Sequence, residues 1–155
     1  MVLVGHANYP VVTRDDKPAS LSRKWITDIL RNKIGYRGLI VSDDLEMGGV
    51  LKAAPIEQAA VEHIRAGGDL CLICHHEEYS RRSYEALIKT AEKDRRLALR
   101  VQESVARVLA FKNKSAELKR HTVTPATAKT EKLSRQLWEF AEQVRLEKIE
   151  RQAGA

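Results

Sequence analysis

The sequence of 155 residues has few aromatic side chains, which make up 5% of it, and only two cysteines. It contains no glycine-rich phosphate loop, no zinc-finger spacing and no run of aromatic residues on which bases could stack. No apolar run approaches the roughly 20 residues that a helix needs to cross a bilayer. We therefore expect neither a membrane-spanning protein nor a nucleic-acid-binding protein.

The two cysteines, Cys71 and Cys74, lie in the apolar run 70–74. In a strand, residues three apart point to opposite faces, which makes a disulfide between them geometrically poor. We expect two buried free thiols. The histidines that follow, His75 and His76, are adjacent and rarely converge on one ion, and no further ligand appears at a supporting spacing. The sequence predicts no metal site and no cofactor.

The net charge of +6 is unevenly distributed along the chain. Most of the surplus follows Lys89, where lysine and arginine alternate with glutamate in helical sequence. This pattern is typical of solvated, ion-paired helix faces rather than of a stripe that follows a phosphate backbone. With 43% hydrophobic and 31% charged residues, the chain has the composition of a soluble globular domain.

The first two thirds of the chain alternate between apolar runs and amphipathic stretches. The runs 1–5, 39–41 and 70–74 predict strands, and 8–18 predicts a long loop. Helices are predicted at the following ranges: 20–34, 55–66, 79–93, 97–118 and 131–152. Strand–helix units of about 35 residues are typical of parallel sheets with helical crossovers. The spacing alone leaves an open doubly wound sheet and a TIM barrel equally open.

Several details of these helices are also predicted. Ser20 or Ser22 can cap the first, whose apolar face is formed by Trp25, Ile29, Leu30 and Ile34. Pro55 begins the second, and glycines 67 and 68 end it. His63 and His121 are expected on exposed helix surfaces.

Polar residues stand directly after the middle strand, where Leu39–Val41 runs into Ser42, Asp43 and Asp44. The segment 38–48 contains the pattern Ser-Asp-Asp-Leu-x-Met and resembles the nucleophile-bearing strand of glycoside hydrolase family 3, in the form found in its β-N-acetylhexosaminidases. Further stretches match the family in order and spacing, at 4–10, 18–22, 30–31, 35–38 and 66–70. The resemblance covers about residues 1–112.

The resemblance implies an α/β fold, namely the C-terminal portion, about strands 6 to 8, of a (β/α)8 TIM barrel with a C-terminal helical extension. We expect residues 1–120 to form this partial barrel domain. Residues 121–130, with a proline and several threonines, predict a linker, and 131–155 a final helix.

The resemblance also implies a retaining glycosidase that releases terminal β-linked N-acetylglucosamine without a cofactor. Asp43 is then the nucleophile, because an oxocarbenium-like transition state needs a fixed negative charge on one face. His6, Asp44 and Met47 are candidates for binding the sugar. For each of them a structural role is the alternative: a hydrogen bond for His6 and Asp44, and packing for Met47.

The family's general acid lies on an earlier loop that this segment does not contain. We therefore expect a fragment with two open sheet edges, which a completing chain or self-association would cover. The alternative is an inactive barrel piece that binds a sugar or a protein. A glycan that contains N-acetylglucosamine is the expected partner, with no nucleic acid and no membrane. The apolar start 1–4 is too short for a signal peptide, and the family suggests cytoplasmic recycling of cell-wall sugars.

Overall fold

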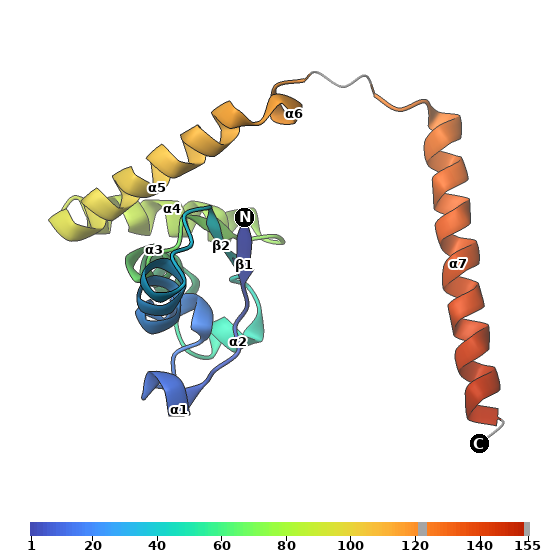
Figure 1. Ribbon diagram of the computed structural model, residues 1–155, viewed down its shortest axis with the longest axis horizontal. Helices are drawn as coiled ribbons and strands as arrows, with labels where there is room; N and C mark the ends of the chain where they lie inside the picture. The colour runs from blue at the N-terminus through green and yellow to red at the C-terminus, as the bar shows by residue number, and fades with distance from the viewer. Residues whose placement is uncertain (121–123, 154–155) are drawn as a thin grey trace. The chain divides into compact units, whose positions relative to one another are not determined.

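A computed structural model describes residues 1–120 and 124–153 of the chain. The chain divides into two compact units, Met1–Leu118 and Lys119–Ala155. The first unit contains a parallel three-stranded sheet in the order β1-β2-β3, made of β1 (Val2–Val4), β2 (Ile40–Asp44) and β3 (Leu70–Leu72) (Figure 1). The sequence therefore predicted the three strands and the mixed α/β class correctly.

Helices connect and follow the strands. The segment between β1 and β2 contains a short helix α1 (Pro10–Thr13), a 3₁₀ turn η1 (Ala19–Leu21) and a π-helix η2 (Lys24–Lys33). Between β2 and β3 lie α2 (Gly48–Leu51) and α3 (Ile56–Ala66). After β3 come α4 (Glu77–Ala91), α5 (Arg95–Lys114) and α6 (Ala116–Lys119). Each crossover returns the chain to the end of the sheet where the previous strand began, which makes neighbouring strands parallel.

The core lies between β2 and the helices of the crossovers. Ile40, the first residue of β2, is fully buried against Ile26 of η2 and Ala66 of α3. On the other side of α3, Ile64 packs with Leu97 of α5. Each such large aliphatic side chain contributes about 1.5–3 kcal/mol when fully buried. The packing of these helices against β2 thus stabilises the position of the central strand.

The first long helix differs from its prediction. It is a π-helix, in which the N–H of Ile34 reaches the carbonyl of Ile29 at 2.8 Å. This wider turn places Ile26 and Arg31, five residues apart, on the buried face, while the side chain of Ile34 is 67% exposed. The predicted apolar face was therefore wrong at Ile34, since it assumed an α-helical period.

Neither predicted cap is used at the start of η2. The residue before the helix is Arg23, and among the described residues no side chain caps the helix. Ser20 is instead the middle residue of the η1 turn, where its hydroxyl bonds His6 at 2.7 Å. The hydroxyl of Ser22 is buried and has no hydrogen-bond partner among the described residues.

The limits of α3 agree with the sequence. Pro55 precedes its first residue, and Gly67 ends it in the left-handed conformation at φ 114°. The N–H groups of Gly67 and Gly68 close the last turn by bonding the carbonyls of Ile64 and His63. Glycine accepts this conformation without the strain that a Cβ would add.

Two predictions about burial were wrong. His63 is not on the surface of α3: it is fully buried, with Nδ1 2.7 Å from the carbonyl of Ser20. Burial lowers the pKa of His63, so that it is held neutral. The strand β3 is shorter than predicted, so Cys74 lies beyond it and is exposed, whereas Cys71 is half-buried; both are free thiols. His121 lies outside the described residues.

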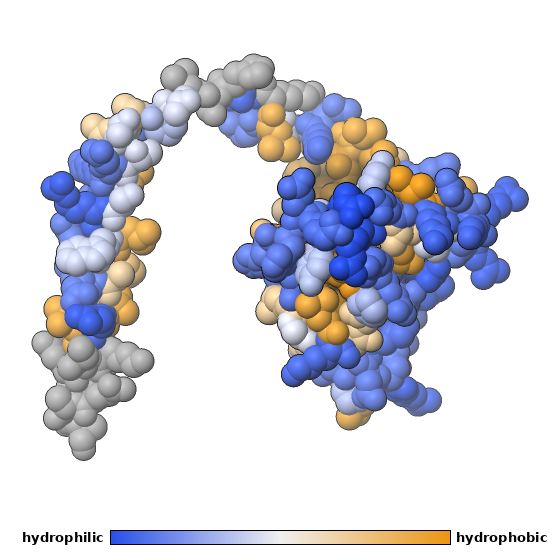
Figure 2. All heavy atoms as spheres, turned by 180° about the vertical axis from the view of Figure 1, so that it is seen from behind, coloured by the Kyte–Doolittle hydropathy of each residue, from blue (hydrophilic) through white to orange (hydrophobic). Residues whose placement is uncertain are grey.

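The second unit contains one long helix, α7 (Thr127–Ala153). It begins before the predicted Glu131, because residues 127–130 already have helical conformation; residues 121–123 of the predicted linker lie outside the described part. Figure 2 shows apolar side chains distributed along this helix between hydrophilic ones, and they include Leu133, Leu137, Trp138, Phe140, Val144 and Leu146, all exposed. None of the described helices is both long enough and apolar enough to span a membrane.

Candidate active site

The carboxyl end of β2 contains an irregularity at the predicted nucleophile. Val41 pairs with Leu70 and Asp44 pairs with Leu72, so that two residues of β2, Ser42 and Asp43, lie opposite a single residue of β3. This is a β-bulge, a feature that redirects side chains and is frequent beside active sites. The fully buried hydroxyl of Ser42 accepts the N–H of Leu72 at 3.0 Å and so replaces part of the interrupted ladder.

Asp43 is half-buried and, among the described residues, is held through one oxygen only. Its Oδ1 accepts the N–H of Asp44 at 2.8 Å. Its Oδ2 has no hydrogen-bond partner within residues 1–120 and 124–153. The carboxylate is therefore oriented by the backbone and still has an oxygen available for another group.

Both carboxylate oxygens and the carbonyl of Asp44 have partners within the protein. Its Oδ1 accepts the N–H of Glu46 at 3.1 Å, and its Oδ2 lies 3.3 Å from Nε2 of His75. Its carbonyl accepts the N–H of Met47 at 3.1 Å and also faces Nε2 of His6 at 2.8 Å. These contacts make Asp44 the residue that organises the turn after β2.

His6 uses both ring nitrogens within the protein. Because a carbonyl only accepts, the contact with Asp44 assigns the proton of the neutral ring to Nε2. Nδ1 then accepts the hydroxyl hydrogen of Ser20. His6 thus joins the segment after β1 to the carboxyl end of β2. In this arrangement neither nitrogen is available to a sugar.

Met47 lies next to this cluster and is more accessible. Its side chain is 48% exposed, and the residue precedes the first turn of α2. The structure therefore brings His6, Asp44 and Met47 together at the end of β2 beside Asp43. Of the three, Met47 has the side chain best placed to meet a molecule from solvent.

Glu46 is a residue of this cluster that was not predicted from the sequence. Its Oε1 accepts the N–H groups of His75 and His76 at 2.9 and 3.0 Å, and Oε2 lies 2.6 Å from Nδ1 of His76. Although desolvation alone would favour the protonated form, these hydrogen bonds and the charge of His76 lower the pKa of Glu46 to about 2. Glu46 consequently stays ionised near neutral pH and links the segment after β2 to the segment after β3.

The thiol of Cys74 lies among these carboxylates. Desolvation, followed by the charge of Asp44 and a hydrogen bond to it, raises the pKa of Cys74, and the charges of Glu46 and Asp43 act in the same direction. The thiol is thereby kept protonated and unreactive. Among the described residues, no group of three histidine, cysteine or acidic side chains is arranged to hold a metal ion.

The opposite, amino end of the strands is held by a buried acid. Asp69, just before β3, has a fully buried side chain whose Oδ2 accepts from Arg31 at 2.5 Å and from the N–H of Ile40 at 3.0 Å. Its Oδ1 accepts hydrogen bonds from the guanidinium groups of Arg100 and Arg107, each at 2.9 Å. This cluster could not be predicted from the sequence, because its members are distant in the chain and the π-helix brings Arg31 inward.

A model of the glycosyl hydrolase family 3 N-terminal domain matches residues 1–111. The chain belongs to glycosyl hydrolase family 3. A β-hexosaminidase of Chromobacterium violaceum is 35% identical to it over 136 residues, which is 88% of this chain and 36% of that relative. A β-hexosaminidase of Bordetella avium is 42% identical over 74 residues, or 48% of this chain and 21% of the relative.

Solved structures of this family have the same fold. The glycoside hydrolase family 3 β-N-acetylglucosaminidase from Paenibacillus sp. str. FPU-7 superposes with a TM-score of 0.73 at 34% identity, over 81% of this chain and 24% of that one. The present family 3 chain thus spans about a third or less of the length of these relatives. The family resemblance deduced from the Ser-Asp-Asp-Leu-x-Met segment is confirmed.

Proposed function

We propose that this family 3 chain supplies the nucleophile of a retaining glycosidase that releases terminal β-linked N-acetylglucosamine, with Asp43 as the attacking carboxylate. The placement of Asp43 carries the proposal: one oxygen is fixed by a backbone N–H at 2.8 Å and the other has no partner among the described residues. An oriented, ionised carboxylate at a strand end is what covalent attack on a sugar requires. The relatives named β-hexosaminidase support the substrate class.

In the first step, Oδ2 of Asp43 forms a bond to the anomeric carbon while the bond from that carbon to the leaving oxygen breaks. The leaving oxygen takes a proton from a general acid. In the second step, water attacks the same carbon, gives a proton to the conjugate base and releases Asp43. Two displacements on opposite faces retain the anomeric configuration.

The neighbouring carboxylates do not fit the role of general acid. The pKa of Glu46, lowered to about 2, leaves it without a proton to donate near neutral pH. Asp44 is occupied by the N–H of Glu46 and by His75. We therefore propose that the acid comes from a part of the domain outside these 155 residues.

We further propose that residues 1–120 are about strands 6 to 8 of a (β/α)8 barrel, followed by a linker that ends where α7 begins, at Thr127. Parallel strands with helical crossovers and polar side chains at their carboxyl ends support this assignment. The sheet edges beyond β1 and β3 would then be covered by the remainder of such a barrel, by a completing chain or by a second copy. The family favours a cytoplasmic role in recycling cell-wall sugars.

A second function is an inactive module that binds an N-acetylglucosamine-containing glycan or a protein. The observation that favours it is that neither Glu46 nor Asp44 fits the role of general acid. In that case Asp43 would contribute to binding at most, and no covalent intermediate would form.

The test uses a substrate that needs little help from a general acid, 2,4-dinitrophenyl N-acetyl-β-glucosaminide. Because its leaving group departs as a stable anion, the assay reports on the nucleophile. We expect a burst of dinitrophenolate and an intact-mass increase of one N-acetylglucosaminyl group. The Asp43→Asn variant should give neither, while the matched Asp44→Asn variant should still form the adduct.

Each alternative gives a different result. A folded wild-type chain that binds the substrate saturably without forming an adduct would favour the binding module. An adduct that persists in Asp43→Asn and disappears in Asp44→Asn would assign the nucleophile to Asp44 instead. Circular dichroism of each variant verifies that the chain is folded.

A further inference from the structure

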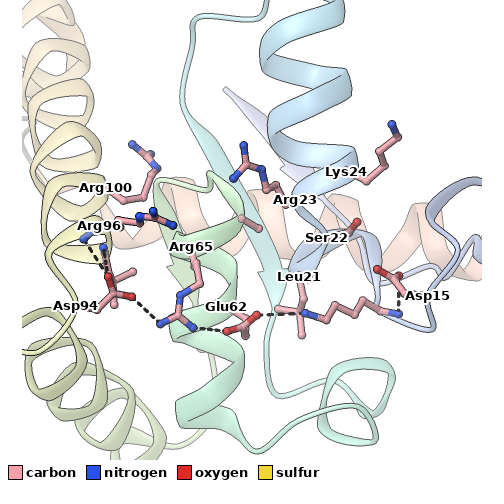
Figure 3. Close-up of a pocket in the computed structure, with 13 residues that line it drawn as sticks. Asp15, Leu21, Ser22, Arg23, Lys24, Glu62, Arg65, Asp94, Arg96 and Arg100 are labelled. Carbon is pink, nitrogen blue, oxygen red and sulfur yellow. Dashed lines mark hydrogen bonds and ion pairs between the residues drawn. The ribbon is translucent and has the colours of Figure 1, made fainter.

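A polar hollow of about 560 Å³ lies away from the cluster around Asp43, between the start of η2, the helix α3 and the start of α5 (Figure 3). Six cationic side chains and three carboxylates line it, which gives a surplus of three positive charges. The whole chain has a net charge of +6. A large part of the basic character of this protein is therefore concentrated in one hollow.

The carboxylates of the hollow are already in use along one wall. Glu62 pairs with Lys17 at 3.4 Å and with Arg65 at 2.5 Å. Arg65 continues to Asp94 at 3.1 Å, and Asp94 also accepts the N–H groups at the start of α5. The third carboxylate, Asp15, accepts the N–H of residue 17. Figure 3 shows this chain of ion pairs along one side of the hollow.

Three cations on the other side have weak partners or none among the described residues, whereas the fourth, Arg100, is already paired with Asp69 and Glu103. Lys24 and Arg96 form no ion pair or hydrogen bond through their side chains within the described parts of the chain. Arg23 approaches Asp28 at 3.8 Å, but both side chains are largely exposed, at 75% and 44%, so this pair contributes little. In Figure 3, Arg23, Lys24, Arg96 and Arg100 lie above the chain of ion pairs.

A buried hydroxyl and a helix end add hydrogen-bond donors to the same wall. Ser22 lines the hollow, is 2% exposed, and its Oγ has no hydrogen-bond partner among the described residues. It lies two residues before η2, a helix of ten residues that has no side-chain cap among the described residues. The first N–H groups of a helix have no partner within it and favour an anion.

We propose that this hollow, which we call the anion pocket and define by Ser22, Arg23, Lys24 and Arg96, binds the phosphate group of a small phosphorylated molecule. Arginine and lysine give charge-assisted hydrogen bonds to phosphate oxygens, and Ser22 with the helix end supplies neutral donors. The volume of about 560 Å³ lies within the range of small-molecule sites and exceeds what one phosphate ion fills. The phosphate is thus the anchor of a larger ligand.

The test measures binding to the full chain by isothermal titration calorimetry at constant ionic strength. The probes are inorganic phosphate, glucose 6-phosphate and glucose, with a short DNA duplex as a fourth. We expect saturable binding of the two phosphates, tighter for the sugar phosphate, and none for glucose. Arg96→Glu and Lys24→Glu should each raise the Kd about tenfold or more, and Ser22→Ala about fivefold.

Matched controls separate a site from general attraction by charge. Arg95→Glu makes the same charge change one residue before Arg96, and Lys33→Glu makes it at the other end of η2; neither residue lines the pocket. Both controls should change the Kd less than twofold (about 0.4 kcal/mol).

Three results would overturn the proposal. Equal losses in Arg95→Glu and Arg96→Glu would show that only net charge attracts the anion. Inorganic phosphate that binds as tightly as glucose 6-phosphate would make free phosphate the ligand. A DNA duplex that binds more tightly than the sugar phosphate and is displaced by it would assign the pocket to nucleic acid.

Discussion

The buried carboxylate of Asp69 offers the sharpest test of how this fold is stabilised. We consider Asp69→Asn, which keeps the size of the side chain and an oxygen for the N–H of Ile40 but removes the charge. Three guanidinium groups then lose their common anion: Arg31, Arg100 and Arg107. The consequence differs among them, because they differ in exposure and in remaining partners.

Arg31 carries most of the expected cost. Its side chain is 9% exposed, and burial already lowers its pKa against the opposing charge of Asp69. Breaking such a buried pair costs about 3–5 kcal/mol, because a charge stays behind without its counter-ion. Arg31 keeps hydrogen bonds to the carbonyls of Tyr36 and Gly38, so we expect the lower part of this range. Arg100 and Arg107 keep Glu103 and are 15% and 33% exposed, so each adds about 0.5 kcal/mol at most. The total is a large part of the roughly 5–15 kcal/mol that stabilises a typical domain.

Urea unfolding of the full chain, followed by circular dichroism, measures this loss. The matched control is Glu103→Gln, which removes a carboxylate from the same arginines at a side chain that is 60% exposed. It should cost about 0.5 kcal/mol or less. If Asp69→Asn costs no more than Glu103→Gln, the three-arginine cluster is not what holds the amino ends of the strands, and the reasoning is refuted.

Two further predictions concern the site and the core. Hydrogen bonds from His75 and His76 lower the pKa of Glu46 from 4.5 to about 2. The ionised Glu46 therefore stabilises the folded state fully above pH 4.5, and this contribution is lost as the pH falls through about 2. The difference in unfolding free energy between wild type and Glu46→Gln should shrink over that interval, and a pH-independent difference would contradict the linkage. A Cβ built at Gly68 would overlap Nε2 of His63, so Gly68→Ala should destabilise by about 1–3 kcal/mol in urea unfolding. Gly48→Ala, where a Cβ meets nothing within 4 Å, is the control and should have little effect.

The order of elements and the place of Asp43 could be predicted from the sequence. Apolar runs such as Leu39–Val41 predict buried strands, and Pro55 and Gly67 limit α3 because their backbone preferences act locally. The pattern Ser-Asp-Asp-Leu-x-Met then placed Asp43 at a strand end. Local signals of this kind do not depend on the rest of the fold.

What could not be predicted depends on contacts between distant segments. The π-helical turn of η2 buries Arg31 rather than Ile34, and it does so where Asp69 supplies a partner. Histidine is often a surface residue, but the buried ring of His63 donates a hydrogen bond from Nδ1 to the carbonyl of Ser20. The link that Glu46 forms likewise depends on the backbone N–H of His76, which lies in the segment after β3. Periodicity and propensity contain no information on such partners.

The distribution of acidic residues along the strands has a practical consequence. Asp69 anchors the amino end of β2 through Ile40, whereas Asp43 lies at the carboxyl end of the same strand. Among the described residues, the two ends of β2 are therefore held by different side chains. Substitutions at Asp43 and its neighbours would leave the contacts of Asp69 in place, so the carboxyl end of this strand can be redesigned without rebuilding its amino end.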